Sequence, residues 1–578
     1  MPAPLPPPDP PSTAWRRHGA YLAGVAALGL FAYSSSLGGA FVYDDVRQIR
    51  DNPLVREPGA LLTAEGYRAA ATRWVGYLSF AFNRRLGGLD PRGFHALNLA
   101  IHLANAALVY ALVVLTFRTP RLRGSALAGW SRAIGFAAAA LFVAHPLQTQ
   151  AVTYVVQRLT SLAATFFLLA VVLYAAWRLR AEAGAVRGAA RVALPGAVVT
   201  SALLAMSTKE IAFTLPLAVA WWDLAFLEGT PRSRLARLAP VLATLPAVPL
   251  AWLWLRTRGG ELADRVADAT RVQSSVPRLD YLATQAGVVL RYLGLLLLPV
   301  GQNVDPDVPI QRALLAPGVL VPAAILAALA GAAAALWART RPGARRPVDP
   351  AARLVAFGVA WFFTTVAVES SVIPIADVMN EHRAYLPSVG IFVAAAAGAA
   401  HLVQRLPRLG GQRTVALAGL ATALVLAVAT RWRNEAWASD VSLWDDAASK
   451  SPAKLRPFVN LGTALSVAGH PELGVRPLRR AVDLDPASAY ARAQLAACLL
   501  SLGRVAEAEP HLREAIRLAP DDAEATFNLA TLLWRTARRD EARSWFARFL
   551  EIAPPAYAAA RRVAAARANP PAPPARTP

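Results

Sequence analysis

Long apolar runs are the feature that most constrains this chain. They recur between residues 19 and 431, and most of them are long enough to cross the hydrocarbon core of a bilayer as an α-helix. Of the 578 residues, 55% are hydrophobic and only 17% are charged. A soluble protein of several domains does not combine so few charges with such runs. The sequence therefore predicts an all-α polytopic membrane protein.

The arginines orient these runs, because cytoplasmic loops of membrane proteins carry an excess of Lys and Arg. Arg16 and Arg17 precede the first run, which lacks a small-residue cleavage site, so the N-terminus is expected in the cytoplasm. The later arginine-rich loops fall on the same side if the run at 281–300 lies in the outer interface. Arg291 in the middle of that run favours this arrangement. The result is a prediction of about 11 spans, with the end of the chain outside. The crossing runs are 19–37, 94–117, 131–148, 150–177, 192–208, 211–228, 235–255, 315–337, 353–373, 385–404 and 414–431.

The net charge of +23 comes from 60 Lys and Arg against 37 Asp and Glu. Such an excess could indicate nucleic-acid binding. Because the membrane topology already accounts for the arginine clusters, no nucleic-acid partner is predicted. The single cysteine, Cys498, excludes an intramolecular disulfide.

A repeat with a period of 34 residues follows the last apolar run. Pro452, Pro486, Pro520 and Pro554 keep this spacing, and so do Asn460, Gln494 and Asn528. This is the tetratricopeptide period, in which each repeat is a pair of helices. In the second helix of the last repeat, Phe549 stands where the other repeats have a small residue. This difference is interpreted as the sign of a terminal repeat whose outer face has no neighbour.

The sequence predicts the following parts of the chain: a disordered cytoplasmic lead (1–18), a membrane domain (19–433) with a first outer loop (38–93) and the interfacial helix (281–300), a leading half-repeat (434–454), three repeats (455–554) and a disordered tail (555–578).

Two adjacent carboxylates, Asp44 and Asp45, follow the first span. By themselves they are typical of a solvated loop or a helix cap. A polar stripe on the second span is more unusual: His95, Asn98, His102 and Asn105 share one helix face. Such a stripe must face protein or a water-filled cavity, so it either joins helices or lines a substrate cavity. The two histidines are seven residues apart, which does not fit a metal site on a helix, and no metal site is predicted.

Cations stand near the outer ends of several spans. Arg158 and Arg383 can hold either a phosphate or ordinary lipid headgroups. Lys209 and Glu210 are interpreted as a mutually neutralising pair.

Taken in order along the chain, these motifs resemble those of the transmembrane and tetratricopeptide-repeat O-mannosyltransferases. The motifs are Phe41-Val42-Tyr43-Asp44-Asp45, Asn52-Pro53, Arg73 with Leu78-Ser79-Phe80, Phe94-His95-Ala96-Leu97-Asn98 with His102, His145-Pro146-Leu147-Gln148-Thr149-Gln150-Ala151-Val152, Gln157-Arg158, Lys209-Glu210, Glu381-His382-Arg383-Ala384-Tyr385-Leu386-Pro387-Ser388, and Asn434 with Trp437. The resemblance covers residues 20–553. It implies a C-type glycosyltransferase fold, a polyprenyl-phosphate sugar donor, and inverting transfer of mannose or another hexose to hydroxyl groups of exported proteins.

A sugar leaving from a lipid phosphate needs no general acid, because the leaving group is a stable anion, so one base suffices. Asp44 or Asp45 is expected to be that base. In an extended loop their side chains point to opposite sides, and the sequence leaves the choice open with a slight preference for Asp45. The resemblance assigns the donor site to Arg158, Arg383, Arg73, His95 and Glu381.

The expected location is a bacterial inner membrane with the repeats in the periplasm, where they would bind the acceptor protein. The expected partners are therefore a lipid-linked sugar and an exported protein, and the need for a divalent metal stays open. Two alternatives remain. One is a membrane-anchored repeat scaffold for envelope assembly, and the other is a lipid-linked oligosaccharide ligase, which would be expected to have a longer loop than 374–384.

Overall fold

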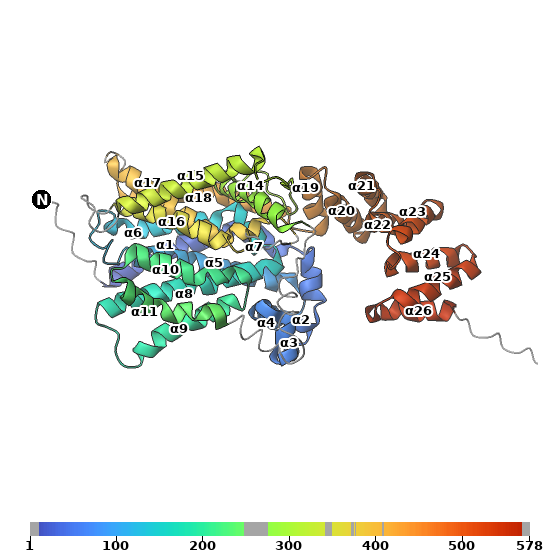
Figure 1. Cartoon of the computed structure of the whole chain (residues 1–578), viewed down its shortest axis with the longest axis horizontal. Helices are drawn as coiled ribbons and strands as arrows, with labels where there is room; N and C mark the ends of the chain where they lie inside the picture. The colour runs from blue at the N-terminus through green and yellow to red at the C-terminus, as the bar shows by residue number, and fades with distance from the viewer. Residues whose placement is uncertain are drawn as a thin grey trace, which may run out of the picture. The chain divides into compact units, whose positions relative to one another are not determined.

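The structure is a computed structural model that describes residues 11–247, 276–340, 349–370, 375, 377–406, 408 and 410–568 (Figure 1). Every regular element in these ranges is a helix, which confirms the all-α prediction. The chain divides into two compact units. Unit 1 consists of Met1–Val304 and Val308–Ser439, and unit 2 consists of Asp305–Asp307 and Asp440–Pro578.

Unit 1 is a bundle of long helices that run side by side (Figure 1). Its longer helices are α1 (Pro11–Tyr33), α4 (Trp74–Gly87), α5 (Pro91–Thr116), α6 (Ser131–Ala144), α8 (Arg158–Glu182), α9 (Ala190–Met206), α10 (Leu215–Phe226), α11 (Pro231–Leu242), α14 (Arg278–Leu297), α15 (Pro317–Arg339), α16 (Pro350–Val366), α17 (Tyr385–Arg405) and α18 (Gln412–Glu435). The predicted disordered lead is wrong in part, because α1 already begins at Pro11.

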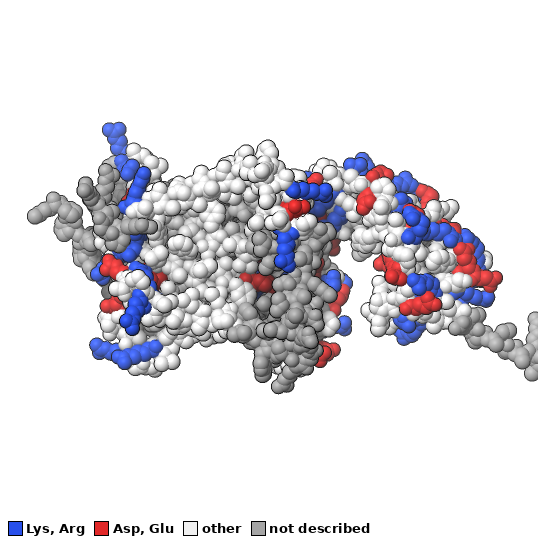
Figure 2. Space-filling model, in the orientation of Figure 1, with Lys and Arg blue, Asp and Glu red and all other residues white. Residues whose placement is uncertain are grey.

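Six described stretches are long and apolar enough to cross a membrane. They are Arg16–Gly38, Pro91–Thr116, Val155–Glu182, Pro317–Arg339, Glu381–Arg405 and Gln412–Glu435. Figure 2 shows that the middle of unit 1 carries hardly any charged side chain on the face in view, whereas Lys and Arg gather at the end drawn on the left. The chain is a multi-pass membrane protein. The number of 11 spans stays a prediction, and the run at 235–255 lies partly outside the described residues.

Close helix contacts in unit 1 depend on small residues, because lipid offers no hydrophobic force that drives two helices together. At the crossing of α16 and α17, a Cβ added to Gly358 would lie 2.2 Å from the carbonyl oxygen of Gly390. A Cβ added to Gly390 would lie 2.2 Å from the carbonyl oxygen of Gly358. The two backbones therefore touch, and no larger residue fits at either position.

The predicted first outer loop is largely helical. It contains a π-helical turn at Val46–Arg50, the short helices α2 (Pro53–Arg56) and α3 (Ala64–Ala70), and then α4. Asn52 caps α2, because its side-chain oxygen accepts the N–H of Leu54 at 2.9 Å. These elements gather at one end of the bundle (Figure 1). We call it the acid-pair end, since Asp44 and Asp45, the acid pair, lie in the same loop.

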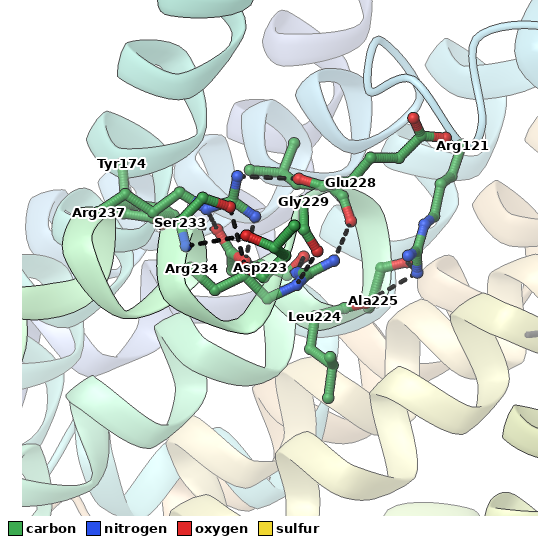
Figure 3. A network of polar contacts seen from close by, with 12 residues as sticks. Arg121, Tyr174, Asp223, Leu224, Ala225, Glu228, Gly229, Ser233, Arg234 and Arg237 are labelled. Carbon is green, nitrogen blue, oxygen red and sulfur yellow. Dashed lines mark hydrogen bonds and ion pairs between the residues drawn. The ribbon is translucent and has the colours of Figure 1, made fainter. Parts of the chain in front are cut away.

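The opposite end of unit 1 is held by a buried carboxylate (Figure 3). Asp223, near the end of α10, accepts hydrogen bonds from Arg234 and Arg237 at 2.6 Å each and from the hydroxyl of Tyr174 at 2.7 Å. Tyr174 lies 16 residues beyond Arg158 on α8, about 24 Å along the helix axis at a rise of 1.5 Å per residue.

Two further arginines bind the last carbonyl groups of α10, which have no partner within the helix. Arg121 donates to the carbonyl oxygen of Leu224 at 2.9 Å, and Arg353 donates to that of Ala225 at 2.5 Å. Arg353 is 1% exposed. Cations at a helix C-terminus also oppose the negative end of the helix dipole, so these side chains stabilise the end of a short apolar helix.

Unit 2 contains the repeats. Its helices are α19 (Asp440–Lys450), α20 (Leu455–Val467), α21 (Pro471–Leu484), α22 (Ala489–Ser501), α23 (Val505–Leu518), α24 (Ala523–Arg535), α25 (Arg539–Ile552) and α26 (Ala558–Ala568). Pro486, Pro520 and Pro554 each stand two residues beyond the end of a second helix, where they prevent its continuation. The helices of the first pair touch at Gly462, whose added Cβ would lie 2.4 Å from Leu478.

The end of the repeat array differs from the prediction. Residues 558–568 form α26, whereas the sequence predicted a disordered tail from 555. α26 packs against α25, and Phe549 is fully buried and contacts Tyr557 edge to face. The interpretation of Phe549 as a sign of a missing neighbour is therefore wrong. The last repeat is covered by an additional helix, as solenoids require at their ends.

Candidate active site

The acid pair lies in a helical turn, so the extended loop expected from the sequence is not present. Asp45 is fully buried. Its carboxylate accepts the backbone N–H of Val42 at 3.1 Å and that of Val156 at 2.7 Å. Burial raises the pKa of Asp45 to about 8, although the backbone hydrogen bonds from Val156 and Val42 act in the opposite direction. Asp45 therefore holds the loop against the beginning of α8.

Asp44 differs from its neighbour, because its side chain is half-buried rather than enclosed. Its backbone N–H donates to the hydroxyl of Tyr154 at 3.1 Å. Tyr43 precedes it with φ of +52°, a left-handed conformation that residues other than glycine rarely adopt. Such strained backbone is often found at functional sites. Of the acid pair, Asp44 has the more accessible carboxylate, whereas the slight preference of the sequence for Asp45 falls on a fully buried side chain.

Arg158 is placed differently from the prediction. It is fully buried beneath the acid pair, with its guanidinium over the ring of Phe80 at 4.7 Å. The guanidinium donates to the oxygens of Asn98 (2.6 Å), Asn83 (2.8 Å), Phe94 (3.0 Å) and Ser79 (3.2 Å). Because protein oxygens surround it, Arg158 is not available to a phosphate and instead joins α4, α5 and α8.

Polar side chains of the stripe on α5 join helices, which is the first of the two alternatives that the sequence left open. Asn98, His102 and Asn105 are each fully buried. Asn98 donates to the carbonyl oxygen of Val152 at 3.0 Å. The hydroxyl of Tyr385 lies 2.7 Å from Nδ1 of His102 and accepts from Asn105 at 3.0 Å. These three members of the stripe therefore join helices inside the bundle.

A group of charged residues, here called the basic cluster, lies near the same end: Arg73, Lys209, Glu210, Glu369 and Arg383. Lys209 Nζ is 3.2 Å from a carboxylate oxygen of Glu369, and Arg383 Nε is 4.0 Å from the same oxygen. Arg73 Nε is 4.0 Å from Glu210. The ion pairs of Lys209 and Glu210 thus involve Glu369 and Arg73, while Lys209 and Glu210 also attract each other electrostatically. Three cations face two carboxylates, which leaves one positive charge for an anionic ligand.

The side chains of the basic cluster differ in exposure. That of Arg73 is 44% exposed, whereas that of Arg383 is 2% exposed. Arg383 donates to the carbonyl oxygens of Asp377 at 2.7 Å and Val378 at 3.1 Å. Arg73 is consequently the cation best placed to contact a ligand directly, while Arg383 holds the backbone that precedes α17.

Burial and charge interactions within the basic cluster shift the pKa values of Glu210 and Lys209. Burial by itself would raise the pKa of Glu210, but the Arg73 guanidinium and the Thr72 hydroxyl outweigh it, so this pKa lies below its ordinary value. Burial lowers the pKa of Lys209, and the Glu369 carboxylate opposes that shift.

Two further residues that the sequence assigned to the donor site, Glu381 and His95, are buried and contact other parts of the bundle. The Glu381 carboxylate accepts the side-chain amide of Gln302 at 3.0 Å and the backbone N–H of Asn303 at 2.6 Å. His95 is 2% exposed and packs against Gly39, whose added Cβ would lie 3.2 Å from its Nε2. Neither side chain is placed to contact a sugar.

The turn that leads into α8 and the first residues of α8 connect the acid pair to the basic cluster. Val156 binds Asp45, and four residues later the hydroxyl of Thr160 accepts a hydrogen bond from Lys209 at 2.8 Å. The N-terminus of α8 also has a partial positive charge, which favours anions. The acid pair and a net positive group of side chains therefore lie next to each other.

The chain was compared with known proteins. Residues 459–522 and 499–557 match the family described as tetratricopeptide repeat. Human protein O-mannosyl-transferase TMTC1 is 35% identical over 182 residues, which are 28% of this chain and 19% of that protein. Drosophila melanogaster protein O-mannosyl-transferase Tmtc3 is 26% identical over 539 residues, which are 83% of this chain and 57% of that protein. The chain is similar to these TMTC proteins over much of its length.

The chain spans less than two thirds of the length of each of these TMTC relatives. Two solved structures also show similarity. YrrB, a tetratricopeptide-repeat protein, is 23% identical with a TM-score of 0.21, over 29% of this chain and 89% of that one. Yeast Tom70 is 13% identical with a TM-score of 0.22, over 71% of this chain and 92% of that one.

The sequence-based assignment of the donor site did not include Tyr154 and Glu369. Tyr154 stands two residues after the His145–Val152 motif, and that position was the only available signal. Glu369 interrupts an apolar run, which a buried carboxylate does only when a cation pairs with it. Among the described residues, no group of three or more His, Cys, Asp or Glu side chains could hold a metal ion.

Proposed function

We propose that this TMTC relative is a membrane glycosyltransferase that moves a sugar, mannose or another hexose, from a polyprenyl-phosphate donor to hydroxyl groups of proteins. The observation that carries the proposal is Asp44, a half-buried carboxylate on a locked loop beside a net positive cluster. The names of the relatives support the type of transfer. The proposed location is a bacterial inner membrane, with the acid-pair end and the repeats on the periplasmic side.

In the proposed reaction Asp44 is the general base. The acceptor oxygen attacks the anomeric carbon from the face opposite the phosphate, the bond from carbon to phosphate oxygen breaks, and the hydroxyl proton passes to the Asp44 carboxylate. The configuration at the anomeric carbon is inverted. No general acid is required, because the phosphate leaves as an anion, and base assistance contributes about 10²–10⁴-fold.

The basic cluster and the N-terminus of α8 would stabilise the charge that develops on the departing phosphate. Arg73 is exposed enough to contact the phosphate, while Lys209 and Arg383 contribute their charge from inside the protein. Fixed charges at such a site act most strongly in the transition state, where the leaving phosphate gains negative charge.

The interfacial helix predicted at 281–300 corresponds to α14, and we propose that the lipid chain of the donor passes along it. A cavity of about 220 Å³ lies between α14 and the loop before α15, and its lining includes Arg291, Gln311 and Met379. Leu297 and Leu298 at the end of α14 are 82% and 64% exposed, which suits a helix that contacts lipid. The repeats are proposed to bind the acceptor protein.

Purified protein in lipid nanodiscs tests this function. The donors are polyprenyl-phosphate mannose and its glucose and galactose counterparts, each mixed with a short Ser/Thr-rich peptide. Release of polyprenyl phosphate together with a peptide heavier by one hexose is the expected result, and parallel reactions with a chelator show whether a divalent metal is needed. Absence of transfer from every donor would contradict the proposal and favour the scaffold alternative. Transfer of a whole oligosaccharide would favour the ligase.

A further inference from the structure

Three aromatic rings form a continuous stack behind Asp44. The rings of Tyr43 and Tyr154 are stacked with centroids 6.4 Å apart, and those of Tyr154 and Trp437 are stacked at 5.3 Å. Tyr154 and Trp437 are 3% and 1% exposed, so both are inside the protein. Offset stacking of this kind fixes the relative positions of the rings.

The middle ring also carries the polar contact to the acid pair. The hydroxyl oxygen of Tyr154 accepts the backbone N–H of Asp44 at 3.1 Å. The Tyr43 backbone, at φ of +52°, directs the chain into this contact, and the Tyr43 ring lies on Tyr154. Ring and hydroxyl together therefore hold the two residues that determine where the Asp44 carboxylate points.

The far side of the stack is fixed to the bundle next to Tyr154. Asn434, three residues before Trp437, accepts a hydrogen bond from the hydroxyl of Thr153 at 2.5 Å and donates to the carbonyl oxygen of Ala32 at 3.0 Å. The backbone N–H of Ala40, four residues before Asp44, donates to the carbonyl oxygen of Ala438 at 3.1 Å. The end of α18 thus anchors both Trp437 and the loop that Tyr154 holds.

We infer that Tyr154 and Trp437 are positioning residues for transfer: the stack and the Tyr154 hydroxyl fix the Asp44 carboxylate at the acceptor. This inference rests on the proposed function, in which Asp44 is the base. A base must lie within hydrogen-bonding distance of the proton it takes, and small displacements of reacting groups lower rates steeply. Neither aromatic residue touches a reacting atom, and both act through Asp44.

The test is a double-mutant cycle between Tyr154→Phe and Asp44→Asn in the polyprenyl-phosphate transfer assay. Tyr154→Phe keeps the ring and removes only the hydroxyl. We expect turnover to fall about tenfold while the KM for the donor stays within about twofold. In the Asp44→Asn background the same change should have no further effect, because there is no carboxylate left to position.

Trp437→Leu removes the outer ring and keeps the hydroxyl, and it should lower turnover in the same direction. Tyr174→Phe is the matched control, since it removes a buried tyrosine hydroxyl from the other end of unit 1 and should leave turnover unchanged. Equal losses from Tyr154→Phe in both backgrounds, or turnover within about twofold of wild type in both Tyr154→Phe and Trp437→Leu, would overturn the inference. If the wild-type protein transfers no sugar, the proposed function itself has failed.

Discussion

One carboxylate oxygen of Asp45 accepts the backbone N–H of Val156 at 2.7 Å, and this bond separates the tasks of two adjacent acids. Asp45 is enclosed and joins the loop after α1 to the beginning of α8, while Asp44 remains half-buried. The two residues are alike in type and neighbours in sequence, but only one has a carboxylate that a substrate can approach.

The first prediction separates the proposed catalytic role of Asp44 from the structural role of Asp45. Asp44→Asn should lower turnover by about 10²–10⁴-fold, because the amide cannot accept the hydroxyl proton, while the thermal unfolding midpoint stays near wild type. Asp45→Asn should lower the unfolding midpoint instead, since one buried N–H loses its acceptor at a cost of about 1–3 kcal/mol. Transfer assays and unfolding curves on both variants check this. Equal effects of the two variants on turnover would contradict the division.

The second prediction concerns pH. Burial raises the pKa of Asp45 from 3.8 to about 8, so the folded protein holds this proton more tightly than the unfolded chain. The stability that the folded protein gains from this tighter proton binding at Asp45 is then fully present below about pH 4, and it is lost as the pH rises towards about 8. The unfolding midpoint of the wild type should therefore fall more steeply between about pH 5 and pH 8 than that of Asp45→Asn. Parallel curves for the two proteins would show that Asp45 does not titrate in this range.

The third prediction concerns Arg73, the exposed cation of the basic cluster. Arg73→Ala should raise the KM for the polyprenyl-phosphate donor by roughly tenfold, because a charge-assisted contact to the phosphate is lost. Arg73→Lys should recover part of this effect. Arg68→Ala removes an exposed arginine from the same segment and serves as the control. An unchanged KM in Arg73→Ala would remove Arg73 from the donor site.

The fourth prediction concerns the opposite end of unit 1. Asp223→Asn leaves Arg234 and Arg237, whose side chains are 14% and 9% exposed, without their carboxylate. Breaking one partner of a buried charge pair costs about 3–5 kcal/mol, so this variant should unfold at a markedly lower temperature. The turnover of the molecules that remain folded should be unchanged. A loss of turnover in the folded fraction would mean that this end takes part in transfer.

The repeats could be predicted from the sequence because their signal is periodic: a proline every 34 residues ends each helix pair, and the structure places each helix end accordingly. The tail could not, since α26 follows a proline and is rich in Ala and Arg, which resembles a linker until a neighbour covers it.

The site was harder to predict for a different reason. Arg158 and Glu381 have the residue types of ligand-binding groups, but burial and partners decide their role, and the partners are amides and backbone groups far away in sequence. Nothing in a sequence marks Asn98 as the acceptor for Arg158. Tyr154 is equally inconspicuous, because one aromatic residue at the start of an apolar helix is usually part of the core.

The last prediction concerns where the membrane unit ends. The sequence placed this boundary at Arg433, but unit 1 extends to Ser439 and includes Asn434 and Trp437. Asn434 binds Thr153, and Trp437 stacks on Tyr154. Truncation after Ser439 should therefore retain turnover on a short acceptor peptide and weaken the use of full-length protein acceptors. Truncation after Arg433 should lose turnover on the peptide as well, because the stack behind Asp44 is then incomplete.

The two truncations differ by six residues, so their comparison isolates this segment from the repeats. Mass spectrometry of the peptide product gives turnover, and gel filtration in detergent shows which protein remains folded. Full activity of the protein truncated after Arg433 would show that residues 434–439 are dispensable. Loss of peptide turnover after both truncations, with both proteins folded, would assign the repeats a part in the chemistry itself and contradict their proposed role in binding the acceptor.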